Sequence, residues 1–209
     1  MKLRLLKLIC LVWVVGLAAC SDDKGGDVPP YITDLLTVST NAEGTVASVL
    51  LDNGKTYNIV SQGISSEVPD TLLRCQGIYT LENGKMTVYS LLLVFSDEAI
   101  PAESFVFVKD GERYEGPEYL PRDPVKLISM WKSGGYINMH VGVLTTGNGQ
   151  HRYAFCQDSV GHYSLVHLRP EGDAESYTEQ VYLSMPLPQG DEVETFTVYT
   201  YNGVETWKF

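Results

Sequence analysis

The sequence predicts an all-β protein made of two small modules. Along most of the chain, apolar residues alternate with polar ones or form short blocks, which is typical of strands rather than helices. Dipeptides that readily adopt positive φ, such as Asn53-Gly54, Asn83-Gly84 and Asn202-Gly203, separate these runs and predict tight hairpins. Three prolines within residues 117–124 divide the strands into two groups of similar length.

Residues 1–19 have the pattern of a lipoprotein signal peptide. A basic start precedes an apolar run over residues 8–19, and the small residues Ala18 and Ala19 come just before Cys20. This order predicts cleavage before Cys20, whose thiol then accepts the lipid, with palmitate as a typical acyl chain. The run is too short to span a hydrocarbon core of about 30 Å comfortably, which argues against a transmembrane helix.

Residues 20–30 are the predicted tether between the acylated Cys20 and the folded part. They are rich in Gly, Asp and Pro, and Val28 is their one large apolar residue. The acidic pair Asp22-Asp23 resembles in part the surface-export signal of lipoproteins from a large group of gut Gram-negative bacteria. We therefore expect a lipid anchor in the outer membrane with display on the cell surface. The periplasmic face is the alternative.

The net charge narrows the classes of partner, and the cysteine content indicates the state of the thiols. The mature chain keeps 12 basic and all 26 acidic residues, a net charge of −14. This balance argues against nucleic acid and against anionic lipid headgroups, because both are bound mainly through Lys and Arg. Cys75 and Cys156 remain beyond the anchor and are expected to be buried free thiols, although an extracytoplasmic compartment would also allow a disulfide.

The first module, residues 31–116, is predicted to be a small Greek-key barrel. Two of its strands, at residues 72–81 and 86–95, are long enough to bend and serve both sides of a coiled barrel. The other candidate strands are residues 35–39, 45–51, 55–61 and 104–109. A short helical turn could form at residues 97–102.

The second module, residues 125–209, follows the proline-rich linker at residues 117–124. Its short strands at regular spacing predict an antiparallel, immunoglobulin-like β-sandwich. The candidate strands are residues 125–132, 136–144, 151–157, 163–169, 181–185, 194–201 and 204–209. We expect residues 171–175 to form an exposed acidic loop, and residues 174–179 could form a helical turn.

Two segments give the chain a resemblance to a known family. They are residues 51–55 (Leu-Asp-Asn-Gly-Lys) and residues 131–138 (Trp-Lys-Ser-Gly-Gly-Tyr-Ile-Asn). Together with the acylated cysteine and the acidic tether, they make nearly the whole mature chain resemble the NigD-like lipoproteins. The resemblance implies an N-terminal OB-type barrel followed by a C-terminal β-sandwich. The family takes its name from a bacteriocin immunity protein, a label based on gene context, and it brings no catalytic residues.

Four aromatic residues are candidates for ligand contacts: Tyr57, Tyr89, Trp131 and Tyr136. Trp131 and Tyr136 flank the tight turn predicted at Gly134-Gly135, where their rings can pack across the strand pair. They could instead offer a stacking platform to a sugar or peptide. Core packing is the preferred interpretation for this pair.

The sequence offers no catalytic or metal-binding constellation. His162 and His167 are expected on opposite faces of a strand, and His151 and His162 could face each other across a hairpin, but no acid or cysteine has ligand spacing. A nucleophile elbow, a phosphate loop and a dinucleotide fingerprint are also absent from the sequence. We therefore expect no metal, no cofactor and no enzymatic activity.

The functional hypothesis is a non-catalytic surface lipoprotein that binds another macromolecule, either a protein or a glycan. An immunity protein that intercepts a toxin at the envelope is one form of it. One alternative is a glycan-capturing accessory protein of a nutrient uptake system. Another is a structural subunit of a surface fibre or adhesin, in which the final strand at residues 204–209 pairs with a neighbour.

Overall fold

The computed structural model describes residues 30–59, 68–109, 111–190 and 192–209. The predicted signal peptide, Cys20 and nearly all of the tether lie outside these residues. Residues Tyr31–Phe209 form one compact unit. Among the described residues, no helix has the length and apolar character needed to cross a bilayer.

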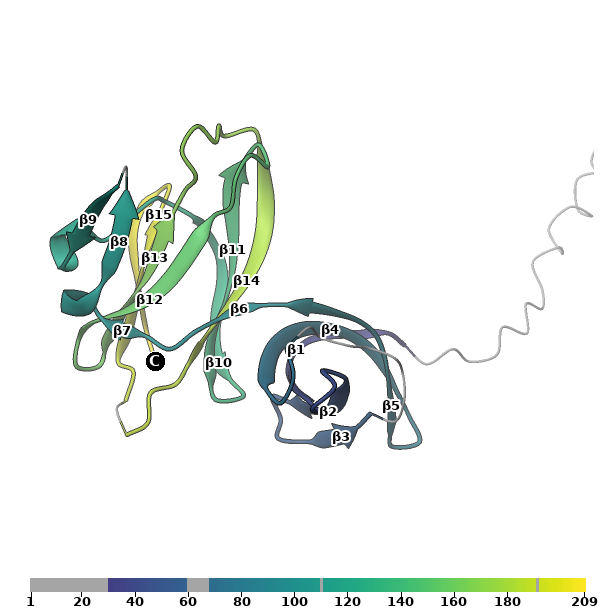
Figure 1. Cartoon of the computed structure of the whole chain (residues 1–209). Coiled ribbons are helices and arrows are strands. Elements are labelled where there is room, and N and C mark those ends of the chain that lie inside the picture. Colours follow the sequence, from purple (N-terminus) through teal and green to yellow (C-terminus); the bar gives the residue numbers. More distant parts are fainter. Residues whose placement is uncertain (1–29, 60–67, 110, 191) are drawn as a thin grey trace, which may run out of the picture. The chain divides into compact units, whose positions relative to one another are not determined.

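The N-terminal part is an antiparallel five-stranded sheet that curls on itself (Figure 1). Its strand order is β3-β2-β1-β4-β5, so β1 pairs with both β2 and β4, as in an OB-type barrel. Leu36, Val49 and Tyr79 fill its core. The strands are β1 (Ile32–Thr40), β2 (Val46–Leu51), β3 (Thr56–Asn58), β4 (Leu72–Glu82) and β5 (Lys85–Leu93).

Local sequence explains the turns and the coiling of this barrel. Asn83 and Gly84 have φ values of +50° and +76°, which is the backbone that a two-residue hairpin between β4 and β5 requires. In β4, Gly77 lies so close to Leu36 that an added Cβ would come within 2.5 Å of its Cδ2 atom. Glycine at this position therefore lets β4 coil tightly over the core.

The C-terminal part is a sandwich of two sheets with strand orders β10-β11-β14-β6 and β16-β15-β13-β12-β7. Alternating side chains of both sheets meet in one core, which includes Met139 of β11, Phe155 of β12 and Phe196 of β15. The long strands are β10 (Lys126–Ser133), β11 (Tyr136–Thr145), β12 (Arg152–Ser159), β13 (His162–Leu168), β14 (Tyr177–Pro186), β15 (Thr195–Thr200) and β16 (Gly203–Lys208). The predicted barrel-and-sandwich fold is thus confirmed.

The segment between the two parts adds strands to the sandwich. β6 (Phe95–Ser96) pairs in parallel with β14, and β7 (Ile100–Pro101) pairs in parallel with β12. Residues 95–101 therefore belong to the sandwich sheets by their pairing, although the sequence grouped them with the barrel.

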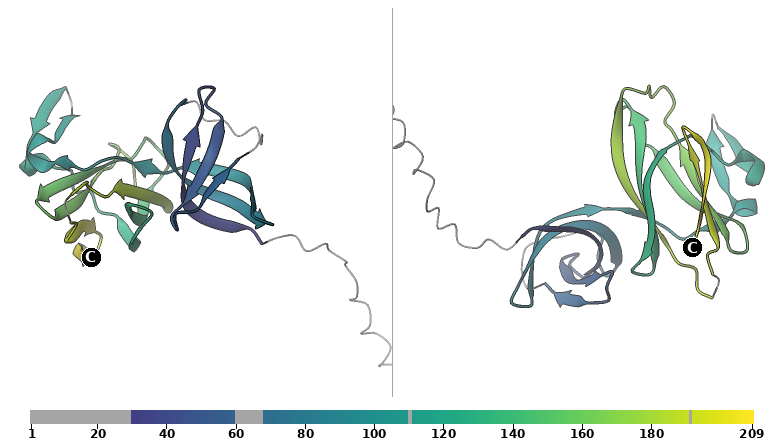
Figure 2. Two further views of the ribbon diagram at one scale, coloured as in Figure 1. Left: turned by 90° about the horizontal axis from the view of Figure 1, so that it is seen from below. Right: turned by 180° about the vertical axis from the view of Figure 1, so that it is seen from behind.

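A small hairpin covers the outside of the sheet that contains β12 (Figure 2). It consists of β8 (Val106–Lys109) and β9 (Glu112–Glu115), between the 3₁₀ turns η1 (Ala102–Ser104) and η2 (Pro117–Tyr119). Phe105 and Leu120 are buried against Cys156 and Val166. The sequence allowed a short helical turn at residues 97–102, and the 3₁₀ turn that forms lies at Ala102–Ser104. None forms at residues 174–179, because β14 begins at Tyr177.

Candidate binding site

A buried ion pair joins the two segments that carry the family resemblance. Arg74 of β4 donates from Nη1 to Asp52 Oδ1 at 2.6 Å and from Nη2 to Asp52 Oδ2 at 2.8 Å. Nη2 also donates to Asn138 Oδ1 at 3.0 Å, and the Ser133 hydroxyl donates to Asp52 Oδ2 at 2.6 Å. Asp52 comes from the first segment, and Ser133 and Asn138 come from the second. We call this group the joint cluster.

Further contacts fix the joint cluster between the barrel and the sandwich. Ser184 of β14 donates to Asn138 Oδ1 at 2.7 Å, and the Arg74 guanidinium lies 4.3 Å from the centre of the Tyr136 ring. Gly134 approaches so closely that an added Cβ would lie 2.1 Å from Asp52 Oδ1. The Gly-Gly-Tyr-Ile-Asn turn therefore packs closely against the joint cluster. One face of the Tyr136 ring covers Arg74.

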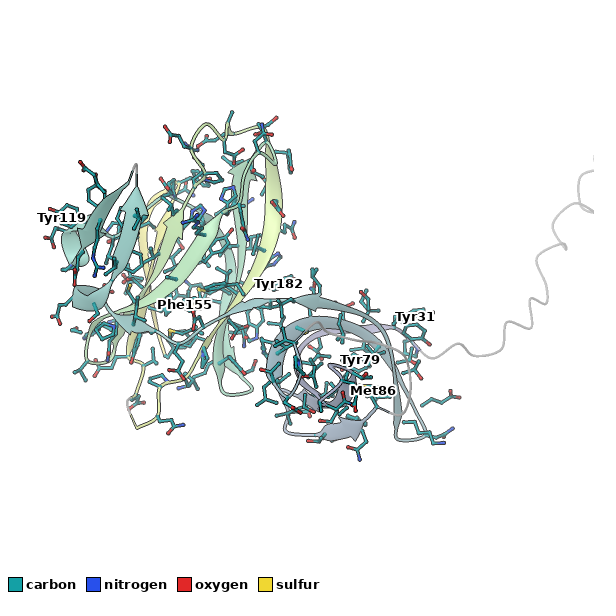
Figure 3. All side chains as sticks on the ribbon, in the orientation of Figure 1. Tyr31, Tyr79, Met86, Tyr119, Phe155 and Tyr182 are labelled. Atoms are coloured by element: carbon teal, nitrogen blue, oxygen red, sulfur yellow. The ribbon has the colours of Figure 1, made fainter. Side chains whose placement is uncertain are left out.

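A cleft of about 800 Å³ lies beside this joint, along one edge of the sandwich. Such a volume suits a bound ligand or a short peptide. Tyr182, labelled in Figure 3, is among the residues that line it. The lining comes from β4 and the β5–β6 connection (Gln76, Leu92, Leu93, Val94, Phe95), from the start of β12 (Gln150, His151, Arg152, Tyr153) and from β14 (Glu179, Gln180, Val181, Tyr182).

Tyr153 supplies this cleft with an unsatisfied polar group. Its hydroxyl is buried and has no hydrogen-bond partner among the described residues. Its ring stacks on His167, with 5.2 Å between ring centres, and lies 5.9 Å from the Phe95 ring. Burial, together with the nearby charge of Glu179, raises the pKa of Tyr153, so the phenol stays protonated. The hydroxyl is therefore an unsatisfied donor in the wall of the cleft, and an acceptor on a ligand reaches it only if the Tyr153 side chain turns toward the cleft.

Two histidines and an aspartate form a closed chain next to Tyr153. His167 Nδ1 lies 3.0 Å from the Asp123 carbonyl oxygen, which can only accept, so Nδ1 carries a proton. Burial lowers the pKa of His167 to about 4, and the ring is therefore neutral with Nε2 as an acceptor. His151 Nδ1 donates to it at 2.8 Å, and His151 Nε2 donates to Asp173 Oδ2 at 3.1 Å. His151 thus bridges the neutral ring of His167 and the carboxylate of Asp173.

This hydrogen-bond network departs from the sequence-based expectations at two residues. His151 faces His167 rather than His162, because the β12–β13 register places Tyr153 opposite His167. Residues 171–175 are exposed as expected except at Asp173, which is only 4% exposed and also accepts hydrogen bonds from the Thr146 amide and hydroxyl. Those bonds hold the pKa of Asp173 well below its usual range. All four ring nitrogens have partners, so neither histidine offers a free base or ligand atom.

The structure does not bring the four aromatic candidates together. Tyr57 is half-buried against the barrel core, and Tyr89 is 53% exposed with its ring edge-on to Tyr31. Trp131 is half-buried on β10, and Tyr136 covers Arg74. None of the four lines the cleft. The cleft residues escaped prediction because their sequence positions give no common motif.

Metal and thiol chemistry have little support in the described part of the chain. It contains no cluster of three or more His, Cys, Asp or Glu side chains that could hold a metal ion. Cys75 and Cys156 are both buried and free. Burial raises the pKa of the Cys75 thiol to about 11 and that of Cys156 to about 12, so both are unreactive at neutral pH.

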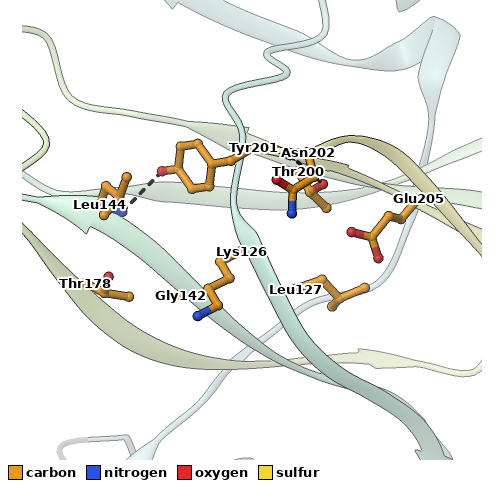
Figure 4. Close-up of a pocket in the computed structure, with 9 residues that line it drawn as sticks. All are labelled: Lys126, Leu127, Gly142, Leu144, Thr178, Thr200, Tyr201, Asn202 and Glu205. Carbon is orange, nitrogen blue, oxygen red and sulfur yellow. Dashed lines mark hydrogen bonds between the residues drawn. The ribbon is translucent and has the colours of Figure 1, made fainter.

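A second, smaller hollow of about 350 Å³ lies at another edge of the sandwich (Figure 4). Lys126, Glu205 and Tyr201 line it, and the Tyr201 hydroxyl accepts a hydrogen bond from the Leu144 amide at 3.2 Å. The Tyr201 hydroxyl thus already has a partner, whereas the Tyr153 hydroxyl has none among the described residues. The larger cleft is therefore the better candidate for a binding site.

Comparison with known proteins finds matches among solved structures. Neither the protein-family models nor the curated proteins give a match to this sequence. Among solved structures, a NigD-like immunity protein from Bacteroides caccae is 25% identical, with a TM-score of 0.64 over 86% of this chain and 93% of that one.

Two further solved structures share this fold. A toxin-related protein from Parabacteroides distasonis is 16% identical, with a TM-score of 0.69 over 86% of this chain and 92% of that one. A protein of unknown function, DUF1344, from Bacteroides vulgatus is 16% identical, with a TM-score of 0.61 over 86% and 90%. The resemblance to the NigD-like proteins, read from residues 51–55 and 131–138, is thus confirmed: the chain has the fold of a NigD-like immunity protein.

Proposed function

We propose that this protein is a non-catalytic lipoprotein that binds a protein partner at the bacterial envelope, in the manner of an immunity protein. Acylation at Cys20 holds it on the outer membrane, and the folded part faces the cell exterior. The observation that carries the proposal is the structural match to a NigD-like immunity protein over 86% of the chain. The closed histidine chain and the two buried thiols also favour binding over catalysis.

Deletion of the gene for this protein in its native cell tests the immunity role. We expect the deletion strain to become sensitive to a protein toxin that it, or a neighbouring strain, secretes, and we expect the full chain to restore resistance. Crosslinking of the acylated protein should then recover that same toxin. Unchanged sensitivity to every secreted toxin, together with no crosslinked protein partner, would refute the proposal.

The anchor and the outward orientation are tested separately. A Cys20→Ser variant should lose metabolic labelling with palmitate and leave the membrane fraction. External protease should digest the native protein on intact cells. Full protection from protease would place the protein on the periplasmic face and would limit its partners to molecules that enter the envelope.

Capture of glycans is a second candidate, because the cleft carries amide and charged side chains that suit sugar hydroxyls. These include Gln76, Gln150, Gln180, Arg152 and Glu179, with Tyr182 beside them. A panel of host and dietary polysaccharides separates the candidates. Saturable binding of one polysaccharide by the native protein, in the absence of any protein partner, would favour this function instead.

A further inference from the structure

β14 has one fully paired edge and one edge that is mostly open. Along β11 the pairing is continuous, from Tyr136 opposite Pro186 to Thr145 opposite Tyr177. On the other side, β6 pairs only with Leu183 and Ser184. Within the described residues, no strand pairs with residues 177–182 on that side. Their outward amides and carbonyls are a template for another strand.

The cleft occupies the place that a longer β6 would fill. β6 runs parallel to β14, so a straight extension before Phe95 would lie along residues 177–182. The chain instead comes from β5, which ends at Leu93 in the barrel. Leu92 and Leu93 therefore stand at one end of the cleft, and the edge of β14 forms its side.

Side chains around this edge suit an apolar, positively charged segment. Leu92 and Leu93 are 64% and 65% exposed, which is unusual for neighbouring leucines unless a partner covers them. Glu179 and Arg152 are the exposed charged residues of the cleft. Across the β5–β6 connection, an adjoining hollow of about 420 Å³ shares Leu93 and adds Asp97 and Glu98. Glu179, Asp97 and Glu98 are thus exposed carboxylates with Arg152 as the exposed cation. Arg74 and His151 also line these hollows, but they are paired with Asp52 and Asp173, and the mature chain has a net charge of −14.

We propose that an extended, cationic segment of the partner protein adds as a β-strand to the open edge of β14 at residues 177–182. This inference rests on the proposed function and names the site and chemistry of the partner. The Tyr153 side chain turns toward the added strand so that its hydroxyl, buried in the free chain, donates a hydrogen bond to a carbonyl of that strand. Apolar side chains of the strand cover Leu92 and Leu93. A glycan lacks backbone donors and acceptors at strand spacing, and the open edge therefore favours a peptide.

Selection of random linear peptides on the full chain tests this inference. We expect the selected peptides to be rich in β-branched and basic residues and to slow amide hydrogen exchange in residues 177–182. Leu92→Glu and Tyr153→Phe should each weaken binding by roughly tenfold or more, as expected for contacts at the centre of an interface. The matched control is Val160→Glu, which changes a 76% exposed apolar residue in the β12–β13 turn, and it should leave affinity unchanged.

Three results would overturn the inference: no peptide is selected, the exchange of residues 177–182 stays unchanged on binding, or both variants bind like the native chain. Polysaccharide binding that the same variants abolish would assign the cleft to a glycan and would also overturn it. Toxin protection that survives both Leu92→Glu and Tyr153→Phe would move the contact elsewhere and leave the proposed function intact. Failure of the proposed function is recognised separately, by a deletion strain with unchanged resistance.

Discussion

Arg74 donates hydrogen bonds to both carboxylate oxygens of Asp52, and its guanidinium is almost completely buried. The same guanidinium also reaches Asn138 of β11, so one side chain of the barrel ties two distant segments together. A buried arginine of this kind needs all of its partners, because an uncompensated buried charge is strongly destabilising. The joint between barrel and sandwich is therefore sensitive to the loss of any one of these partners.

Arg74→Ala should lower the free energy of unfolding by about 3 to 5 kcal/mol, because it leaves the Asp52 carboxylate unpaired in a partly buried site. Denaturant unfolding measures the change. The matched control is Arg113→Ala, which removes an exposed ion pair with Glu115 and should cost less than about 1 kcal/mol. Equal effects of the two substitutions would contradict the role assigned to the joint cluster.

Gly134→Ala should destabilise the protein more than Gly135→Ala. Both glycines have positive φ, +60° and +83°, so each alanine carries a backbone strain of roughly 1 to 3 kcal/mol. Only the Cβ at position 134 would also meet Asp52, whereas no atom of the described residues lies within 4 Å of a Cβ at position 135. Thermal unfolding of the two variants provides the comparison. If position 135 proved as costly as position 134, the close approach to Asp52 would not matter.

His167 should make stability depend on pH between 6.5 and about 4. Burial lowers its pKa from 6.5 to about 4, so over this interval the unfolded chain binds more protons than the folded one. The contribution of neutral His167 is complete above pH 6.5 and is lost as the pH falls through about 4. The full loss corresponds to roughly 3 kcal/mol.

Denaturant unfolding across this pH range measures the loss. The control is His167→Gln, which keeps a donor and an acceptor but cannot titrate, and it should flatten the dependence. Identical pH dependence in the native and variant proteins would show that another group is responsible.

Tyr153→Phe should leave the free energy of unfolding unchanged or raise it by about 1 kcal/mol, because it removes a buried hydroxyl that has no hydrogen-bond partner among the described residues. The matched variant is Tyr163→Phe, whose hydroxyl accepts a hydrogen bond from Gln157 at 3.3 Å, and it should lose about 1 kcal/mol. Calorimetry of both variants without any ligand measures these changes in the free energy of unfolding. A clear loss of stability in Tyr153→Phe would mean that its hydroxyl has a structural partner and is not available to a ligand.

The local features of the fold were predictable from the sequence. Alternating apolar residues located the long strands, since a half-buried strand has a period of two residues. Asn83-Gly84 fixed the hairpin between β4 and β5, because few other residue pairs adopt positive φ at low cost. Residues 51–55 and 131–138 were recognisable as similar to segments of the NigD-like proteins, and the fold that this resemblance implied was confirmed.

Only the tertiary structure showed which of these local pieces meet. Asp52 and Ser133 are 81 positions apart, and His151 and Asp173 are 22 apart, with no shared motif to connect them. The pairing of β6 with β14, and the open edge beside it, follows from how the chain leaves the barrel. A strand pattern specifies which face of each strand is apolar, but strand order and side-chain pairing are decided by long-range packing. The sequence by itself thus determined the elements and their turns, and packing decided the joint, the histidine chain and the cleft.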